Sequence, residues 1–281
     1  MNIFQSVFLG ILQGITEFLP VSSSGHLAVA QKLFGLDEVP LIFDVCLHVA
    51  TLAAVVLFFR KAIISLLAVF VRMVTRKPLE GDKPKQITIL AVIIATVITG
   101  ILGVVSSHFI EDAPIKLVCV GFIFTGILLV LATVLDKSGK TEDGALSAEE
   151  AAAAEQAEGA VSIKQGIICG IAQGLGTLPG ISRSGSTISA AILSGVDRKT
   201  AGEFSFILSI PAILGAFILE VKDLGEMTSV VSVPCLAAGC LTAFLAGLGA
   251  LFVLMKLIKS GRLGFFAIYL IPLGIAGLFL F

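Results

Sequence analysis

Two short stretches of this chain place polar and charged side chains inside otherwise apolar sequence. The first, QGITEFLPVSSSGH at 13–26, contains the carboxylate of Glu17, the hydroxyl of Ser23 and the imidazole of His26. The second, QGLGTLPGISRSGST at 173–187, contains Arg183 between two serines. These are the groups that bind a phosphate and move protons around it. The two stretches therefore predict an anion site at which chemistry could take place.

The spacing within each stretch indicates which side chains work together. Gln13 and Glu17 are four residues apart, so in a helix they lie on one face and reach one ligand. Glu17 is suited to act as a general base or as an oxygen ligand for Mg²⁺ or Ca²⁺. His26 follows Ser23 by one helical turn, where it can take or return a proton. The planar fork of Arg183 suits two-pronged binding of phosphate oxygens.

Simpler explanations exist for the same residues. Serine and glycine let membrane helices pack closely, Glu17 could hold two helices together by hydrogen bonds alone, and His26 could be a satisfied interior histidine. The packing explanation weakens because Ser-x-Ser-Gly occurs twice, beside ionisable side chains that are costly in a membrane. His48 and His108 lie outside the two polar stretches, and no chemistry is assigned to them.

The composition identifies an integral membrane protein. Hydrophobic residues make up 57% of the 281 positions and charged residues 14%, against about 25% charged in an ordinary soluble domain. The fold class expected is an all-α polytopic membrane protein, with full spans of the ~20 residues that cross a bilayer. The six spans are expected near 42–59, 86–106, 115–135, 201–219, 231–256 and 263–281.

Two hydrophobic regions, 3–34 and 164–196, are too broken to be single spans, and they contain the two polar stretches. Leu19-Pro20 interrupts the first and Leu178-Pro179 the second, because proline lacks an amide hydrogen and disfavours helix at the preceding residue. Each region is expected to form a re-entrant helical hairpin. Since irregular backbone is not tolerated against lipid, both breaks should face a protected cavity.

The second arm of each hairpin is expected to begin at a serine. Ser22 and Ser182 are favourable N-cap residues, whose side-chain oxygen accepts a hydrogen bond from a first-turn backbone N–H. A helix N-terminus also carries a partial positive charge. Two such ends at one cavity reinforce the prediction of an anion site.

The chain divides into two halves of similar plan within one membrane domain, 1–281. Residues 1–135 and 163–281 each contain one hairpin followed by three full spans. Of the 19 Lys and Arg residues, 15 fall in loops on one side of the alternating spans, which indicates the cytoplasm. The hairpin at 3–34 then enters from outside and that at 164–196 from inside, an inverted-topology repeat. The site is expected to open to the outer face.

Three further segments or residue types have expected roles. Ala62–Thr75 is expected to be an interfacial helix. Residues 136–162, rich in Ala, Glu and Gly, are expected to form a flexible cytoplasmic loop. The five cysteines lie in apolar stretches and form no C-x-x-C pair, so we expect them to act as small hydrophobic side chains.

Together, the two motifs resemble those of the undecaprenyl-diphosphate phosphatases, a family also known for bacitracin resistance. QGITEFLPVSSSGH is similar to the family's (E/Q)-x-x-x-E motif with its following serines and histidine, and LPGISRSGST to its P-G-x-S-R-S-x-x-T motif. EFSFILSIP at 203–211 and FFAIYL at 265–270 extend the resemblance to the whole chain except 136–162. Either motif alone is weak, but the pair is specific.

The resemblance implies hydrolysis of undecaprenyl diphosphate to undecaprenyl phosphate with a divalent cation, Mg²⁺ or Ca²⁺, in the bacterial plasma (inner) membrane. This reaction renews the lipid carrier of peptidoglycan synthesis. Gln13 stands where many members have glutamate, which leaves Glu17 as the only carboxylate of the first motif and as the implied metal ligand. The implied catalytic residues are Glu17, Ser23, His26 and Arg183, and the substrate-binding residues are Gln13, Ser22, Ser182, Ser184 and Thr187.

Two mechanisms and a second class of function stay open. Ser23 could attack phosphorus with His26 and Glu17 handling proton and metal, or water could attack with Glu17 as the base. A transporter or flippase for a phosphate-bearing lipid would also use inverted repeats with broken helices. The repeat and broken helices alone slightly favour transport. The Glu-Ser-His grouping, which transport does not require, together with the family resemblance favours the enzyme. The expected partners are a polyprenyl diphosphate and membrane lipids, with no nucleic acid; a homodimer is left open.

Overall fold

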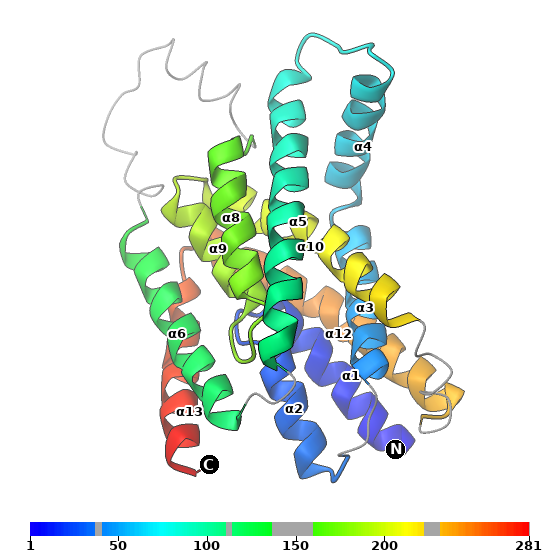
Figure 1. Ribbon diagram of the computed structural model, residues 1–281, viewed down its shortest axis with the longest axis vertical. Coiled ribbons are helices and arrows are strands. Elements are labelled where there is room, and N and C mark those ends of the chain that lie inside the picture. Colours follow the sequence, from blue (N-terminus) through cyan, green and yellow to red (C-terminus); the bar gives the residue numbers. More distant parts are fainter. Residues whose placement is uncertain (37–40, 111–113, 137–159, 222–230, 281) are drawn as a thin grey trace.

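The computed structural model describes residues 1–36, 41–110, 114–136, 160–221 and 231–280. Every regular element in these ranges is a helix (Figure 1). In chain order the elements are α1 (Ile3–Phe18), α2 (Ser23–Leu33), α3 (Leu41–Phe58), α4 (Arg60–Val74), α5 (Lys83–Ile110), α6 (Ile115–Val134), α8 (Ile163–Leu175), α9 (Arg183–Leu193), α10 (Arg198–Glu220), α12 (Val233–Lys259), the 3₁₀ helix η2 (Leu263–Phe266) and α13 (Ala267–Leu280).

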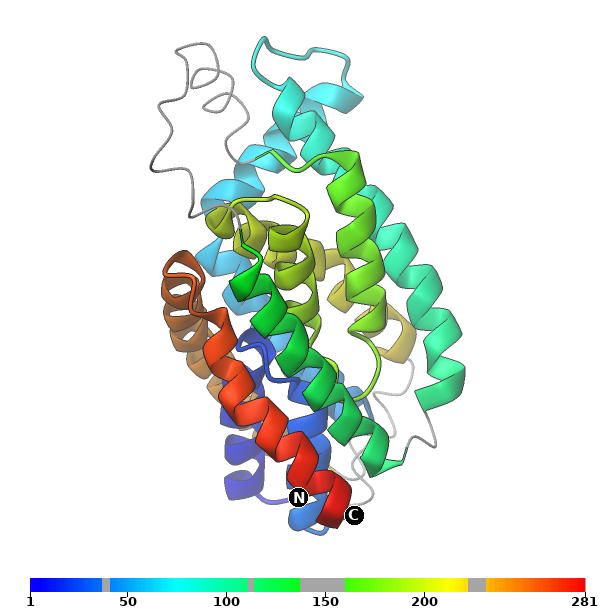
Figure 2. The same cartoon turned by 90° about the vertical axis from the view of Figure 1, so that its left-hand side faces the viewer.

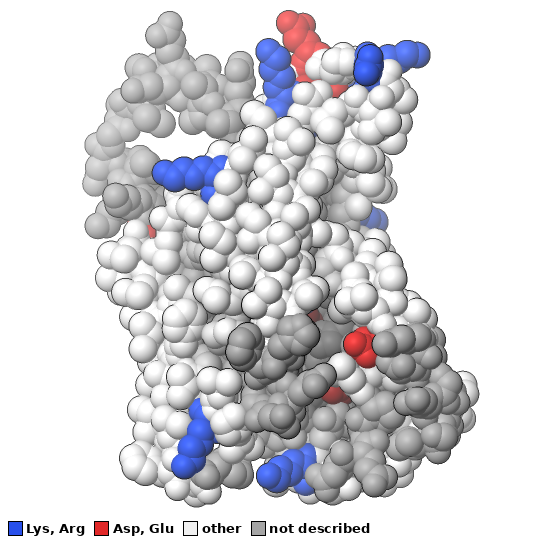
Figure 3. All heavy atoms as spheres, in the orientation of Figure 1, with Lys and Arg blue, Asp and Glu red and all other residues white. Residues whose placement is uncertain are grey.

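Six segments are long and apolar enough to cross a membrane: α3, α5, α6, α10, α12 and Leu263–Leu280, which comprises η2 and α13. They coincide with the six spans that the sequence predicts. The prediction of six spans is confirmed, and the chain is a multi-pass membrane protein. Figure 3 shows Lys and Arg side chains around the end that carries the α4–α5 turn and others near the opposite end, with a broad surface between them that bears few charges. That this end faces the cytoplasm stays a prediction.

The two expected hairpins are pairs of short helices, α1–α2 and α8–α9. The helix α1 ends at Phe18, directly before the predicted stop at Leu19-Pro20. The helix α8 ends earlier, at Leu175, and a turn leads on to Leu178-Pro179. Figure 1 shows α1 and α2 in the lower half of the molecule and α8 and α9 in the upper half. Re-entry of these pairs from the membrane surfaces stays a prediction.

Both first arms begin with the same capping box. The side chain of Asn2 accepts a hydrogen bond of 2.9 Å from the backbone N–H of Gln5, and Ser162 accepts one of 3.3 Å from Gln165. In each case the glutamine side chain accepts a bond from the N–H of the cap residue. The box satisfies backbone groups that a helix start would otherwise leave free. The two first arms therefore share the way in which they begin as well as a polar motif.

Small residues let each first arm lie directly against a long helix of the other half. The helix α1 packs along α12, and α8 packs along α5, as Figure 2 shows for the second pair. A Cβ atom on Gly170 would lie 2.7 Å from the Cα of Ala95, and one on Gly14 would lie 2.5 Å from the carbonyl oxygen of Ala243. Only glycine permits this approach of the two backbones.

Two further contacts join corresponding spans of the two halves. The first full spans, α3 and α10, contact each other, and so do the last spans, α6 and α13. The match is incomplete, because α6 also packs against α9, whereas α13 and α2 do not pack as closely. The division at 1–135 and 163–281, and the inverted orientation of the halves, stay predictions.

The other sequence expectations have mixed outcomes. The segment Ala62–Thr75 is helical as part of α4, but its place at a membrane interface stays a prediction. The expected flexible loop at 136–162 lies outside the described residues except at its two ends. All five cysteines are unpaired thiols.

Replacing Gly170 by valine should force α8 away from α5 and displace the break that carries Arg183. Overpacking of this kind costs roughly 1–3 kcal/mol, so we expect a lower thermal unfolding temperature in detergent. Gly249→Val is the matched control, because a Cβ there has no atom within 4 Å. Equal unfolding temperatures for the two variants would show that the α5–α8 approach is not required.

Candidate active site

The two helix breaks contact each other, as the sequence predicts. Ser184 Oγ, in the first turn of α9, donates a hydrogen bond of 3.1 Å to the carbonyl oxygen of Phe18, the last residue of α1. The ring of Phe18 is buried and meets the ring of Phe206 edge-on, with the centroids 5.6 Å apart. These contacts fix the end of α1, and with it Glu17, against the start of α9.

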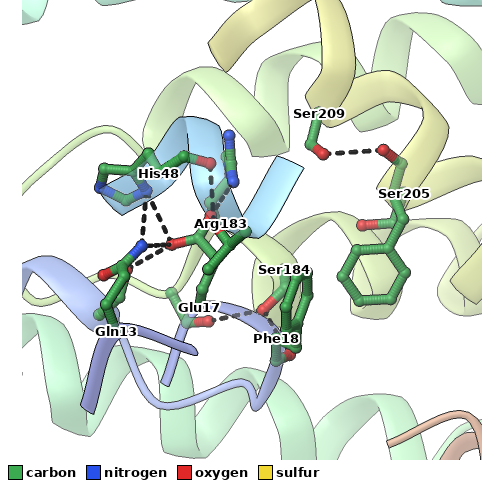
Figure 4. A network of polar contacts seen from close by, with 12 residues as sticks. Gln13, Glu17, Phe18, His48, Arg183, Ser184, Ser205 and Ser209 are labelled. Carbon is green, nitrogen blue, oxygen red and sulfur yellow. Dashed lines mark hydrogen bonds and ion pairs between the residues drawn. The ribbon is translucent and has the colours of Figure 1, made fainter. Parts of the chain in front are cut away.

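Glu17 is buried at this junction and joins the two breaks. Its Oε1 pairs with Nη2 of Arg183, and its Oε2 accepts a hydrogen bond of 2.7 Å from Ser23 Oγ at the start of α2. Figure 4 shows Glu17 and Arg183 lying against each other. Leaving one charge of a buried pair without its partner costs roughly 3–5 kcal/mol, so each side chain requires the other. Three of the four predicted catalytic residues are therefore together.

Gln13 lies beside Glu17, as their spacing predicts. Its Nε2 donates a hydrogen bond of 3.0 Å to Glu17 Oε2. Sequence analysis missed the next neighbour, His48 of α3, whose Nδ1 lies 3.0 Å from Glu17 Oε2 and 2.8 Å from Gln13 Nε2 (Figure 4). A signal was present, because a lone ionisable side chain inside an apolar span indicates function by itself.

His26 is held by residues other than Ser23. Its Nδ1 lies 2.8 Å from the carbonyl oxygen of Ser22, and its Nε2 lies 2.8 Å from the hydroxyl of Tyr269 in α13. With Nδ1–H donating to the carbonyl, Nε2 is left to accept from the tyrosine. Among the described residues, the hydrogen-bond partner of Ser23 is Glu17. A proton-transfer role for His26 stays a prediction.

The two predicted N-cap serines differ. Ser182 caps α9, since its Oγ accepts a hydrogen bond of 3.1 Å from the N–H of Gly185. Ser22 stands at the N-cap of α2 but makes no cap bond, so the prediction that a backbone N–H occupies its oxygen is wrong. A capping residue has β-region angles, whereas Ser22 has φ of 68°, a left-handed conformation that costs energy for any residue with a side chain.

The remaining predicted binding residues hold the break in place. Ser184 binds the end of α1, and Thr187 Oγ1 donates to the carbonyl oxygen of Arg183 at 2.9 Å and contacts Ser205 Oγ of α10. The N–H of Ser182 donates to Thr125 Oγ1 of α6 at 3.0 Å. These bonds position the start of α9 and thus Arg183. Direct substrate contacts by Ser182, Ser184 and Thr187 stay predictions.

Two large cavities reach the neighbourhood of this cluster. One of about 590 Å³ lies between α3, α5 and α10 and has His48 and Arg183 on its wall. Much of the rest of its lining is small, including Gly100, Gly103, Ala212, Gly215 and Ala216. The other, of about 390 Å³, has His26 and Tyr269 on an otherwise largely apolar wall. The first cavity gives an anion a path to the guanidinium.

The arrangement can bind an anion and activate a hydroxyl at the same place. Arg183 supplies a positive charge, and the start of α2 supplies backbone N–H groups beside it. Ser23 already donates its hydroxyl hydrogen to a carboxylate, which is the geometry of a serine paired with a general base. Glu17 and Gln13 also place oxygen-bearing side chains where a divalent cation could bind.

Comparison with known proteins agrees with this chemistry. The family model "Bacitracin resistance protein BacA" matches residues 6–276. An undecaprenyl-diphosphatase of Treponema denticola is 44% identical over 275 residues, covering 98% of this chain and 96% of the relative. Undecaprenyl-diphosphatases of Methanosphaera stadtmanae (38% over 285 residues, 98% and 96% covered) and Borrelia hermsii (36% over 280 residues, 100% and 99% covered) are also similar. With the joined breaks and near full-length matches, the chain belongs to the BacA bacitracin-resistance family.

Proposed function

We propose that this chain hydrolyses undecaprenyl diphosphate to undecaprenyl phosphate and inorganic phosphate. The observation that carries the proposal is the shared carboxylate of Glu17, with a serine hydroxyl on one oxygen and an arginine on the other. Family membership and the names of the relatives support the same substrate. The product is the lipid carrier of peptidoglycan synthesis. Its renewal in the bacterial plasma membrane accounts for bacitracin resistance.

The diphosphate binds where the two breaks meet. Phosphate oxygens compete with the carboxylate of Glu17 for Arg183, whose planar fork can bind two of them at once. The start of α2, which Ser22 does not cap, adds backbone N–H groups and a partial positive charge. When Arg183 turns to the phosphate, Glu17 Oε1 loses its partner and the carboxylate becomes available for a proton.

Ser23 is the proposed nucleophile. Its Oγ forms a bond to the terminal phosphorus, the bond from that phosphorus to the bridging oxygen breaks, and undecaprenyl phosphate leaves. The hydroxyl proton passes to the Glu17 carboxylate, whose Oε2 lies 2.7 Å from Ser23 Oγ, and from there to solvent. Water then attacks the phosphoserine and gives its proton to Glu17. The bond from phosphorus to Ser23 Oγ breaks, phosphate leaves, and Glu17 returns the proton to Ser23. In the competing mechanism water attacks the diphosphate directly with Glu17 as base, and Ser23 only binds phosphate.

A divalent cation, Mg²⁺ or Ca²⁺, fits the donors of this site. Such cations take carboxylate and amide oxygens. Glu17 supplies the first kind, and the amide oxygen of Gln13, which is buried without a hydrogen-bond partner, can supply the second. Glu17 and Gln13 would hold the ion, which would help to neutralise the charge of the diphosphate.

The lipid tail requires a path from the membrane to the site. The cavity of about 590 Å³ provides one, with Arg183 and His48 at the polar part of its wall and small or apolar residues around them. Its lining comes from the later part of α5 and α10 and the early part of α3. The sequence places these ends on the outer side, so access from the outer face is proposed.

A transporter or flippase for a phosphate-bearing lipid is the second candidate, favoured by the same cavity beside broken helices. Transport of an anion needs the positive charge of Arg183, but it needs no hydroxyl paired with a carboxylate. Phosphate release from undecaprenyl diphosphate by the purified protein separates the two functions.

Arg183→Lys should reduce turnover on the order of 100-fold, because an ammonium keeps the charge but cannot bind two phosphate oxygens as a planar fork. The measurement is phosphate release at saturating substrate and metal. Arg198→Lys is the matched control. Arg198 is the first residue of α10 and pairs with Asp136, away from Glu17 and Arg183. Near-normal turnover by Arg183→Lys would show that only the charge is needed.

Ser23→Ala should reduce turnover by at least about a thousandfold and abolish any trapped phosphoenzyme, since the variant lacks the attacking oxygen. The control is Ser24→Ala, which removes a neighbouring exposed hydroxyl and should keep most activity. Substantial turnover by Ser23→Ala at saturating substrate and metal would instead favour direct attack by water.

A further inference from the structure

Three polar atoms from two different helices form a closed triangle beside the site. Glu17 Oε2 lies 3.0 Å from Gln13 Nε2 and 3.0 Å from His48 Nδ1, and the last two atoms are 2.8 Å apart. Gln13 is fully buried, and the side chain of His48 is 27% exposed. Figure 4 shows the three side chains converging.

Hydrogen bonds cannot satisfy all three edges of this triangle. If Gln13 Nε2 donates to both neighbours, His48 Nδ1 turns a lone pair toward the carboxylate. If His48 Nδ1–H donates to Glu17, its hydrogen faces the N–H groups of Gln13. If the amide is turned so that its oxygen faces His48, that oxygen lies against Glu17 Oε2. With Glu17 ionised, each of these arrangements brings like groups together on one edge.

The amide oxygen of Gln13 is an independent sign of a missing partner. As placed, Oε1 is buried and has no hydrogen-bond partner. A buried carbonyl oxygen without a partner costs roughly 1–3 kcal/mol. Turning the amide would bring this oxygen to the triangle, where only a positive charge could stabilise it beside the carboxylate.

We propose that Gln13, Glu17 and His48 form a three-donor site for a divalent cation, in which His48 supplies a nitrogen ligand. The inference rests on the metal requirement of the proposed function and names a ligand outside both motifs. Neighbouring ligands at right angles around an octahedral ion, each ~2.1 Å from it, are about 3.0 Å apart. The edges of the triangle, 2.8–3.0 Å, match one face of such an octahedron.

The surroundings allow an ion to reach this face. His48 and Arg183 both line the cavity of about 590 Å³, so the His48 corner of the triangle borders the space through which the diphosphate is proposed to enter. Asp44, one turn before His48 on α3, places a second carboxylate on the same face of that helix, where its Oδ1 accepts a hydrogen bond of 2.8 Å from Gln31 Nε2. Beside Glu17 and His48, the third donor of the site is the amide of Gln13.

The donor set selects among divalent cations. Carboxylate and amide oxygens suit Mg²⁺, Ca²⁺ and Mn²⁺, whereas imidazole nitrogen favours first-row transition ions. A site with one nitrogen and two oxygens should bind Mn²⁺ more tightly than Mg²⁺ or Ca²⁺. Mn²⁺ is also paramagnetic, so it reports its ligands directly.

The test measures Mn²⁺ binding to the purified full chain in detergent after treatment with a chelator. Electron paramagnetic resonance gives the affinity, and pulsed experiments detect coupling to an imidazole nitrogen. The wild type should bind Mn²⁺ with nitrogen coupling. His48→Gln should lose the coupling and bind Mn²⁺ at least about tenfold more weakly. His26→Gln, the same change at a histidine outside the triangle, should keep both the coupling and the affinity.

Labelling the wild type with ¹⁵N-histidine tests the ligand without any substitution that could disturb folding, because the coupling should change to that of ¹⁵N. Failure to bind Mn²⁺, binding without nitrogen coupling, or coupling that survives His48→Gln would each overturn the site. Phosphate release is measured on the same samples. Its absence with intact nitrogen coupling would overturn the proposed function alone, whereas turnover without nitrogen coupling would overturn the metal site alone.

Discussion

The ion pair between Glu17 and Arg183 is the interaction on which the rest of the structure depends. Each charge lies on a different half of the chain, and each is too costly to bury in an apolar protein without the other. The halves must therefore meet at their helix breaks. Proline ends α1, and glycines bring α1 against α12 and α8 against α5. The packing of the long helices thus places Glu17 and Arg183 in contact.

The two polar motifs match in sequence, but matched positions make different contacts in the structure. In the aligned motifs Gln13 corresponds to Gln173, and Ser23 corresponds to Arg183. Gln173 makes a structural bond, from its Nε2 to Thr99 Oγ1 at 3.2 Å, whereas Gln13 joins the site. Equivalent positions at the two breaks thus hold a hydroxyl and a guanidinium. Two serines would lack the positive charge of Arg183, and two arginines would lack the hydroxyl of Ser23.

Local signals in the sequence predict the framework well. The six spans follow from hydropathy, and the breaks follow from the effect of proline on its own and the preceding residue. The meeting of Glu17, Ser23 and Arg183 also follows, because the two motifs match each other and an unpaired charge is costly in a membrane. The causes of the spans and breaks lie within a few residues of them, whereas the meeting of Glu17 and Arg183, 166 residues apart, follows from the match between the two motifs.

The features of the site that the sequence does not predict depend on contacts between residues far apart in the sequence, or on backbone angles. His48 enters the site because α3 packs beside α1; its place inside an apolar span hints at a function but does not indicate which residues it joins. Tyr269, 243 residues away in the sequence, contacts Nε2 of His26, whereas the spacing suggested that His26 acts with Ser23. The left-handed backbone of Ser22 is unexpected for serine, so its residue type wrongly predicted a cap.

In the proposed mechanism Glu17 accepts the proton when the diphosphate is cleaved. Glu17→Gln preserves the shape of the side chain but removes this proton acceptor. Turnover, expressed per folded molecule because Arg183 loses its partner, should fall by at least about a hundredfold. Phosphate release within a few-fold of the wild-type rate by folded Glu17→Gln protein would contradict the account.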